Sequence, residues 1–268
     1  RKGSCCCFQV RCHLIDYMNN SMVHILILLL GLCIGSFLNV CIYRIPLKQD
    51  IVKLSSHCMN CGRKLKWYEL IPVVSFLIQG GRCRSCKIKL SVQYPIIELL
   101  NGLLYLLIYY TYGLSVKTAI LCALASVLIV ISVVDFRTYE IPIGCNIFIL
   151  ILGILNVFSD LPHMSKYVIG FFAVSLVLYL LWLLSKGRAI GGGDIKFLAA
   201  AGLLLGWQNI TLAFLLGCII GSVIHIIRMK VHNADRTLAF GPYLSVGVLI
   251  AAVYGDKLIN LYLGYLGF

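Results

Sequence analysis

The sequence predicts an all-α polytopic membrane protein with about eight transmembrane helices and a small cytoplasmic zinc-knuckle domain between the first and the second. Hydrophobic residues make up 60% of the 268 residues and charged residues only 12%, with a mean hydropathy of +0.95. So few charges cannot cover the surface of a soluble domain of this length. Apolar runs long enough to cross a bilayer recur along the chain, and one long polar loop carries two Cys-x-x-Cys pairs.

The membrane segments are predicted from apolar runs, because a helix of about 20 apolar residues crosses the hydrocarbon layer. These runs cover 23–43, 96–112, 118–134, 143–158, 166–185, 197–228 and 238–265. The run over 197–228 is interrupted by Gly206-Trp207-Gln208-Asn209, which predicts a short helix, a turn and a second helix. We interpret 1–22 as an N-terminal extension and 23–43 as a retained first span, since this run is longer than the core of a signal peptide.

The distribution of basic residues predicts the orientation. With the loop 44–94 inside the cell, 17 of the 23 basic residues face the cytoplasm and 6 face outward. Cytoplasmic loops of membrane proteins carry such an excess of lysine and arginine, so both termini are expected outside the cytoplasm. The bias also explains the net charge of +13, and the expected partner is the lipid bilayer rather than nucleic acid.

Four cysteines in the long polar loop predict a metal site. They form two Cys-x-x-Cys pairs, Cys58 with Cys61 and Cys83 with Cys86. Four thiolates suit the tetrahedral coordination of zinc, and Gly62 permits a tight turn after the first pair. Disulfides and free thiols are the alternatives, and a reducing cytoplasm disfavours the disulfides. A metal with four protein ligands has no open position, so the expected Zn2+ is structural.

Three acidic residues stand apart from the others. Of the ten acidic residues, Glu98, Asp135 and Asp194 lie against apolar sequence, and an ionisable group at membrane depth indicates function. Asp135 follows the run 118–134, and Asp194 begins the third helix after it. In the predicted topology both aspartates therefore lie at the cytoplasmic ends of their spans, at the same depth.

This placement predicts a catalytic pair. Two neighbouring carboxylates share a proton, so that one activates water as a base while the other donates as an acid. From the helix dipoles, we expect Asp135 at a helix C-terminus to be the acid and Asp194 at a helix N-terminus to be the base. Gly191-Gly192-Gly193 would let a peptide approach the backbone before Asp194. Alternatively, these glycines loosen a loop and Asp194 caps its helix, while Glu98 caps its own helix or pairs with a basic loop residue.

A series of short segments stands out along the chain. They are Gly35-Ser36-Phe37-Leu38-Asn39-Val40, Tyr43-Arg44-Ile45-Pro46, both cysteine pairs, Trp67-Tyr68-Glu69-Leu70-Ile71-Pro72-Val73-Val74-Ser75, Tyr94-Pro95-Ile96-Ile97-Glu98-Leu99-Leu100, Asp135 through Ile141-Pro142, Gly191-Gly192-Gly193-Asp194-Ile195-Lys196 and Phe240-Gly241-Pro242-Tyr243. In these segments and in their order the chain resembles the type IV prepilin peptidases, also called leader peptidase/N-methyltransferases. Each segment is weak evidence alone, whereas the ordered set over about 23–245 is specific. Met59 and Gln93 replace the proline and arginine that family members often carry.

The resemblance implies an aspartic endopeptidase of the bacterial cytoplasmic (inner) membrane. Such enzymes remove the short basic leader of prepilins or pseudopilins after a glycine, in type IV pilus assembly, type II secretion or competence. By this resemblance Asp135 and Asp194 are the catalytic residues, in a peptidase core over 95–268, and the four cysteines bind zinc. We expect Glu98, Lys196 and the three glycines to support the site. Many members also methylate the new N-terminus with S-adenosylmethionine, although no nucleotide-type fingerprint is present here.

Three other functions fit parts of the sequence. A presenilin-type intramembrane protease also uses a GxGD motif, but the cysteine loop and the GSFLN and FGP stretches argue against it. A transporter or membrane scaffold would use Asp135 and Asp194 as coupling carboxylates and the cysteine loop as a docking module. A membrane-tethered nucleic-acid-binding zinc module would explain the basic loop, which the orientation bias already explains.

Overall fold

The computed structural model describes residues 4–51, 53–188, 190–232 and 238–265, and of residues 4–21 and 232 it describes the backbone alone. Within these ranges the regular secondary structure is helical, with two isolated β-bridges and no strand. The predicted all-α class is therefore confirmed. The chain divides into two compact units, residues 1–37 with 55–110 and residues 38–54 with 111–268. Residues 1–3 of the predicted extension and 266–268 of the predicted core lie outside the described residues.

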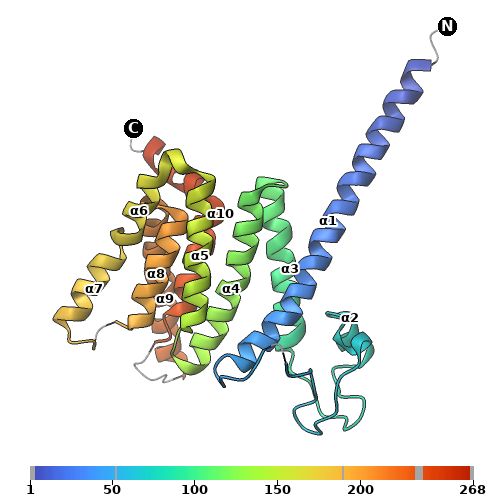
Figure 1. The fold of residues 1–268 in the computed structure, drawn as a ribbon, viewed down its shortest axis with the longest axis horizontal. Helices are drawn as coiled ribbons and strands as arrows, with labels where there is room; N and C mark the ends of the chain where they lie inside the picture. The colour runs from blue at the N-terminus through green and yellow to red at the C-terminus, as the bar shows by residue number, and fades with distance from the viewer. Residues whose placement is uncertain (1–3, 52, 189, 233–237, 266–268) are drawn as a thin grey trace. The chain divides into compact units, whose positions relative to one another are not determined.

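The first unit contains two long helices that pack through small residues. Its elements are α1 (Ser4–Arg44), the 3-10 helix η1 (Trp67–Leu70), α2 (Val74–Ile78) and α3 (Gln93–Tyr112). Of α1 the residues up to 37 belong to this unit, and of α3 those up to 110. α1 and α3 run side by side (Figure 1). A Cβ atom on Gly31 would lie 2.7 Å from the Cα of Gly102, so the crossing needs glycine. The buried amide of Asn101 donates a hydrogen bond of 2.7 Å to the carbonyl of Gly31.

The second unit is a helical bundle, drawn from green (α4) to red (α10) in Figure 1. Its elements are α4 (Val116–Thr138), α5 (Ile143–Ser159), η2 (Leu161–His163), α6 (Met164–Ala173), α7 (Ser175–Leu184), α8 (Gly192–Leu205), α9 (Trp207–His232) and α10 (Gly241–Tyr265). α8 packs against α5, α6, α7, α9 and α10. A Cβ atom on Gly202 of α8 would overlap the carbonyl oxygen of Gly170 on α6, so glycines allow these helices to approach closely.

Among the described residues, five helical segments are long and apolar enough to cross a membrane. They are Met22–Arg44, Val116–Thr138, Leu161–Leu184, Trp207–Val231 and Gly241–Tyr265, and Ile143–Ser159 is a shorter apolar helix. The remaining predicted spans coincide with α3 and α8, so each predicted span is helical while the count of eight stays a prediction.

The structure confirms one predicted interruption and adds another. Gly206 separates α8 from α9 with a φ of 81°, a left-handed conformation that suits glycine. The run 166–185, expected as one helix, is divided at Val174 into α6 and α7. No glycine or proline marks this second break, and the residue pattern did not predict it.

Candidate metal site and candidate active site

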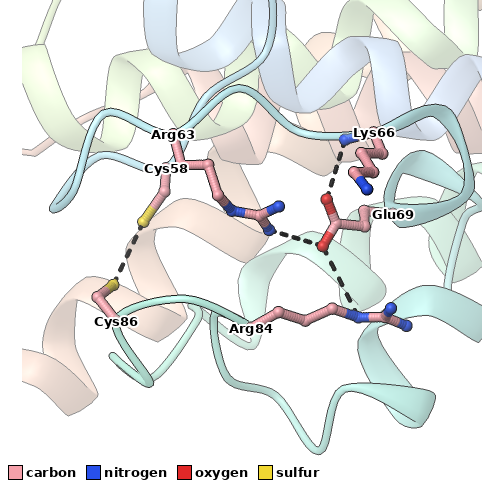
Figure 2. A network of polar contacts seen from close by, with 6 residues as sticks. All are labelled: Cys58, Arg63, Lys66, Glu69, Arg84 and Cys86. Carbon is pink, nitrogen blue, oxygen red and sulfur yellow. Dashed lines mark hydrogen bonds and ion pairs between the residues drawn. The ribbon is translucent and has the colours of Figure 1, made fainter.

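The structure brings the four cysteines of the loop together. Their Sγ atoms all lie within 4.8 Å of one another, and those of Cys58 and Cys86 are 3.7 Å apart (Figure 2). A zinc ion bound to four sulfurs at about 2.3 Å separates neighbouring sulfurs by about 3.8 Å. The cysteine cluster therefore fits a tetrahedral zinc ion. Cys58 and Cys83 are buried, whereas Cys61 is exposed.

The two cysteine pairs have the same backbone turn. The residue after each pair has a positive φ, 68° at Gly62 and 58° at Lys87. Each donates its N–H to the carbonyl of the first cysteine of its pair, at 2.9 Å to Cys58 and 3.0 Å to Cys83. The turn predicted at Gly62 is present, and the equivalent turn at Lys87 was missed because lysine rarely takes this conformation.

The equivalence extends beyond the turns. The N–H of Leu65 donates to the carbonyl of Ser56 at 2.9 Å, and the N–H of Leu90 donates to that of Gly81 at 2.8 Å. These pairs, like Cys58 and Cys83, are offset by 25 positions. We call the two repeats knuckle 1 (residues 56–65) and knuckle 2 (residues 81–90).

Knuckle 2 favours the metal-binding form of its cysteines. The backbone N–H groups of Cys86 and Ser85 donate to the sulfur of Cys83 and lower its pKa to about 6. The N–H of Ile88 lowers the pKa of Cys86 in the same way. Thiolates, not thiols, bind metals, so these hydrogen bonds prepare the pair for a cation.

A buried carboxylate lies between the two knuckles. The side chain of Glu69, on η1, is 1% exposed. It accepts hydrogen bonds from Nη2 of Arg63 at 2.7 Å and from the backbone N–H of Lys66 at 2.9 Å, and the Nε of Arg84 lies 3.7 Å away (Figure 2). The Arg63 hydrogen bond, followed by that from Lys66, lowers the pKa of Glu69. From its place in the polar loop we expect Glu69 to be a solvated charge; that expectation is wrong, because the fold buries the carboxylate among these donors.

Asp135 belongs to the second unit, near the C-terminal end of α4. Its side chain is buried, and Oδ2 accepts a hydrogen bond of 2.8 Å from the N–H of Gly241, the first residue of α10. A Cβ atom on Gly241 would lie 2.7 Å from this oxygen. Glycine is therefore required for the hydrogen bond, which gives the FGP stretch a structural role that its sequence did not indicate.

Asp194 lies in the first turn of α8 and is half-buried. The charge of Asp135 acts on it, so the bundle brings the two carboxylates into one electrostatic environment. The glycine-rich segment contributes to this approach, because a Cβ atom on Gly193 would lie 3.3 Å from the Cβ of Ile141, in the connection after α4. The roles expected from the helix dipoles stay a prediction, and the N-terminus of α10 is a second dipole that faces Asp135.

Comparison with known proteins places the chain in a family. The model of the type IV leader peptidase family matches residues 122–226, and that of the bacterial peptidase A24 N-terminal domain matches residues 29–112. A prepilin leader peptidase/N-methyltransferase of Pseudomonas putida is 31% identical over 89% of this chain and 93% of its own length. The chain belongs to the type IV leader peptidase family. Similarly named proteins of Pseudomonas aeruginosa and Aeromonas salmonicida are 29% and 31% identical, over 95% and 89% of this chain and 99% and 93% of their own lengths. No solved structure matches.

Both sites of this type IV leader peptidase family member lie within the matched regions. The N-terminal domain model includes the four cysteines and Glu69, and the leader peptidase model includes Asp135 and Asp194. The match ends before Gly241, which the structure nevertheless joins to Asp135.

The residues expected to support the site have different surroundings. Gly191, Gly192 and Lys196 are exposed at the start of α8, beside Asp194. Glu98 is buried in the first unit, where its carboxylate accepts a hydrogen bond of 2.7 Å from the N–H of Val73. Its partners are therefore the loop backbone and the side chain of Ser36 rather than a basic side chain.

Proposed function

We propose that this protein is an aspartic endopeptidase of the bacterial inner membrane that cleaves the leader peptide of prepilins or pseudopilins after a glycine. The close packing of Gly193, next to Asp194, against Ile141, in the connection after the helix that carries Asp135, supports this proposal. Relatives that match most of the chain are named prepilin leader peptidase/N-methyltransferase. The excess of basic residues in the loops supports a cytoplasmic position for the site.

The proposed reaction uses the two carboxylates as a pair. One takes a proton from a water molecule, whose oxygen attacks the scissile carbonyl carbon, while the other donates its proton to the carbonyl oxygen. When the tetrahedral intermediate collapses, the amide nitrogen leaves with a proton from the pair. The N–H of Gly241 holds Oδ2 of Asp135 and fixes the orientation of that carboxyl group. The exposed glycines before Asp194 leave room for the extended backbone of a substrate.

We further propose that the new N-terminal amine is methylated, with S-adenosylmethionine as the donor of the methyl group. The names of the relatives support this second activity. It is assigned to the protein as a whole and to no individual residue.

The proposed domains follow the sequence: an extension over 1–22, a first span over 23–43, a zinc-binding domain over 44–94 and a peptidase core over 95–268. Zinc bound to Cys58, Cys61, Cys83 and Cys86 would join the two knuckles. With all four positions taken by protein, the ion would stabilise the loop and leave hydrolysis to the aspartates.

The proposed peptidase is tested with purified protein and a prepilin-like substrate. We expect Asp135→Asn and Asp194→Asn each to lower the cleavage rate by about 10²- to 10⁴-fold, the contribution of general acid–base catalysis. Glu140→Gln, which changes an exposed carboxylate close to Asp135 in sequence, is the matched control. Cleavage at the wild-type rate by either aspartate variant would refute the pair. Ion- or substrate-dependent flux in proteoliposomes without cleavage would favour a transporter instead.

A further inference from the structure

The 3-10 helix η1 connects knuckle 1 to knuckle 2. It begins at Trp67, separated from knuckle 1 by one residue. Two of its side chains contact Arg84, which lies between the cysteines of knuckle 2: the guanidinium carbon is 5.1 Å from the ring centre of Tyr68, and Nε is 3.7 Å from the carboxylate of Glu69. A single turn of helix therefore holds one arginine of the opposite knuckle through an aromatic ring and a carboxylate.

The same carboxylate also holds knuckle 1. Oε1 of Glu69 accepts a hydrogen bond of 2.7 Å from Arg63, and Oε2 accepts one of 2.9 Å from the backbone N–H of Lys66 (Figure 2). Arg63 and Arg84 occupy different positions of the repeat, since Ile88 stands at the position equivalent to Arg63 and Met59 at that equivalent to Arg84. The two arginines therefore converge on Glu69 from the two knuckles without repeat symmetry.

Glu69 is the one negative side chain in a basic loop. It is the only acidic residue between Asp50 and Glu98, a stretch that contains eight basic residues. A carboxylate that is 1% exposed remains ionised only when cations and hydrogen-bond donors compensate its burial. Arg63, Arg84 and the Lys66 N–H provide this compensation.

We propose that Glu69 is a positioning residue of the metal site, which holds the two knuckles at the spacing where four thiolates close on one zinc ion. This inference rests on the proposed zinc role. Residues that orient metal ligands from outside the coordination sphere change metal affinity by about 10- to 100-fold when they are mutated. Glu69 acts in this way on both cysteine pairs at once, through Arg63 and Arg84.

Zinc affinity of the full-length purified protein, measured by competition with a chelator of known affinity, tests the proposal. Glu69→Gln keeps the volume and an acceptor for the Lys66 N–H but removes the charge, and we expect about 10- to 100-fold weaker binding. Arg82→Gln, an exposed arginine of knuckle 2 outside the network, should leave the affinity within about twofold of wild type. Arg63→Gln should weaken binding and Arg63→Lys should restore part of the affinity. Unchanged affinity in Glu69→Gln would overturn the proposal.

A metal-free measurement separates this proposal from the zinc assignment. In protein stripped of metal, Glu69 should keep the sulfurs of Cys58 and Cys86 close, so that a thiol oxidant joins them in a disulfide faster in wild type than in Glu69→Gln. Peptide mapping by mass spectrometry identifies the product. Equal rates in the two proteins would contradict the positioning role. A wild-type protein that binds no zinc, yet forms this disulfide faster than Glu69→Gln, would refute the metal function alone and retain Glu69 as the link between the knuckles.

Discussion

At the scale of single residues, the proposed active site depends on a contact that spans 106 positions of the chain. Gly241 begins α10, and its N–H is the hydrogen-bond donor to Asp135. The N-terminus of a helix carries partial positive charge, so the start of α10 is suited to hold and orient this carboxyl group. A residue with no catalytic chemistry of its own thereby becomes part of the proposed site.

Gly241→Ala should therefore impair cleavage. The added Cβ would lie 2.7 Å from Oδ2 of Asp135, and displacement of a reacting group by about 1 Å costs on the order of 10²-fold in rate. The measurement is the rate of prepilin cleavage at saturating substrate. Gly144→Ala is the control, because no atom lies within 4 Å of its Cβ position. A Gly241→Ala enzyme with wild-type kinetics would show that the contact does not orient Asp135 during catalysis.

At the scale of secondary-structure elements, two features depend on particular residues: the close crossing of α6 and α8, and the turn that both knuckles share. The α6–α8 crossing depends on Gly170 and Gly202, and α8 presents Asp194 at its N-terminal end. The knuckles use one turn geometry with two different residues at the positive-φ position, Gly62 and Lys87. The crossing is a steric requirement between two helices, whereas the turn is a local backbone requirement, and substitution can test each.

Gly202→Ala should destabilise the bundle. Its Cβ would overlap the carbonyl of Gly170, and overpacking of a tight contact costs about 1–3 kcal/mol. Thermal unfolding in detergent measures the effect. Gly264→Ala, on α10 with no atom near its Cβ position, provides the comparison; equal melting temperatures for the two variants would exclude a tight α6–α8 contact.

The two knuckles should respond to substitution in opposite directions. Gly62 has open space around its Cβ position, so Gly62→Ala adds only backbone strain of about 1 kcal/mol. Lys87→Gly removes the same strain from knuckle 2 and should increase the resistance of the loop to heat. Lys89→Gly, at a position without positive φ, should instead lower it. Limited proteolysis of the zinc-loaded protein across a temperature series ranks the variants by the heat resistance of the loop. A Gly62→Ala loop more resistant than wild type would contradict this prediction.

At the scale of the whole molecule, the two proposed sites lie in different compact units. The cysteine cluster belongs to the first unit and the two aspartates to the second. Each unit has its own buried contacts, Asn101 to Gly31 in the first and Asp135 to Gly241 in the second. Loss of the metal should consequently destabilise the loop before it affects the bundle.

Chelation of zinc should make the loop sensitive to protease while the bundle stays helical. The knuckles have little regular secondary structure of their own, whereas α4 to α10 bury an extensive apolar core. Protease cleavage mapped by mass spectrometry should increase between residues 55 and 92, with little change of helical circular dichroism. Loss of most of the helical signal on chelation would mean that the bundle itself requires the metal.

Much of this protein follows from local sequence. The apolar runs predict the helices because burial in lipid depends on local composition, and the interruption at Gly206 follows from the backbone freedom of one residue. Cysteine spacing predicts the four-sulfur cluster, since each pair forms within one turn. The candidate aspartates stand out because acidic residues are rare here, ten in 268.

Only the tertiary structure decided which distant groups meet. The hydrogen bond from Gly241 to Asp135, the convergence of Arg63 and Arg84 on Glu69, and the pairing of Glu98 with the N–H of Val73 join segments that share no periodicity. The break at Val174 likewise carries no glycine or proline signal. These features arise from packing between helices and loops. A buried polar group forms a hydrogen bond with whichever group the fold places next to it, and that neighbour need not be close in the sequence.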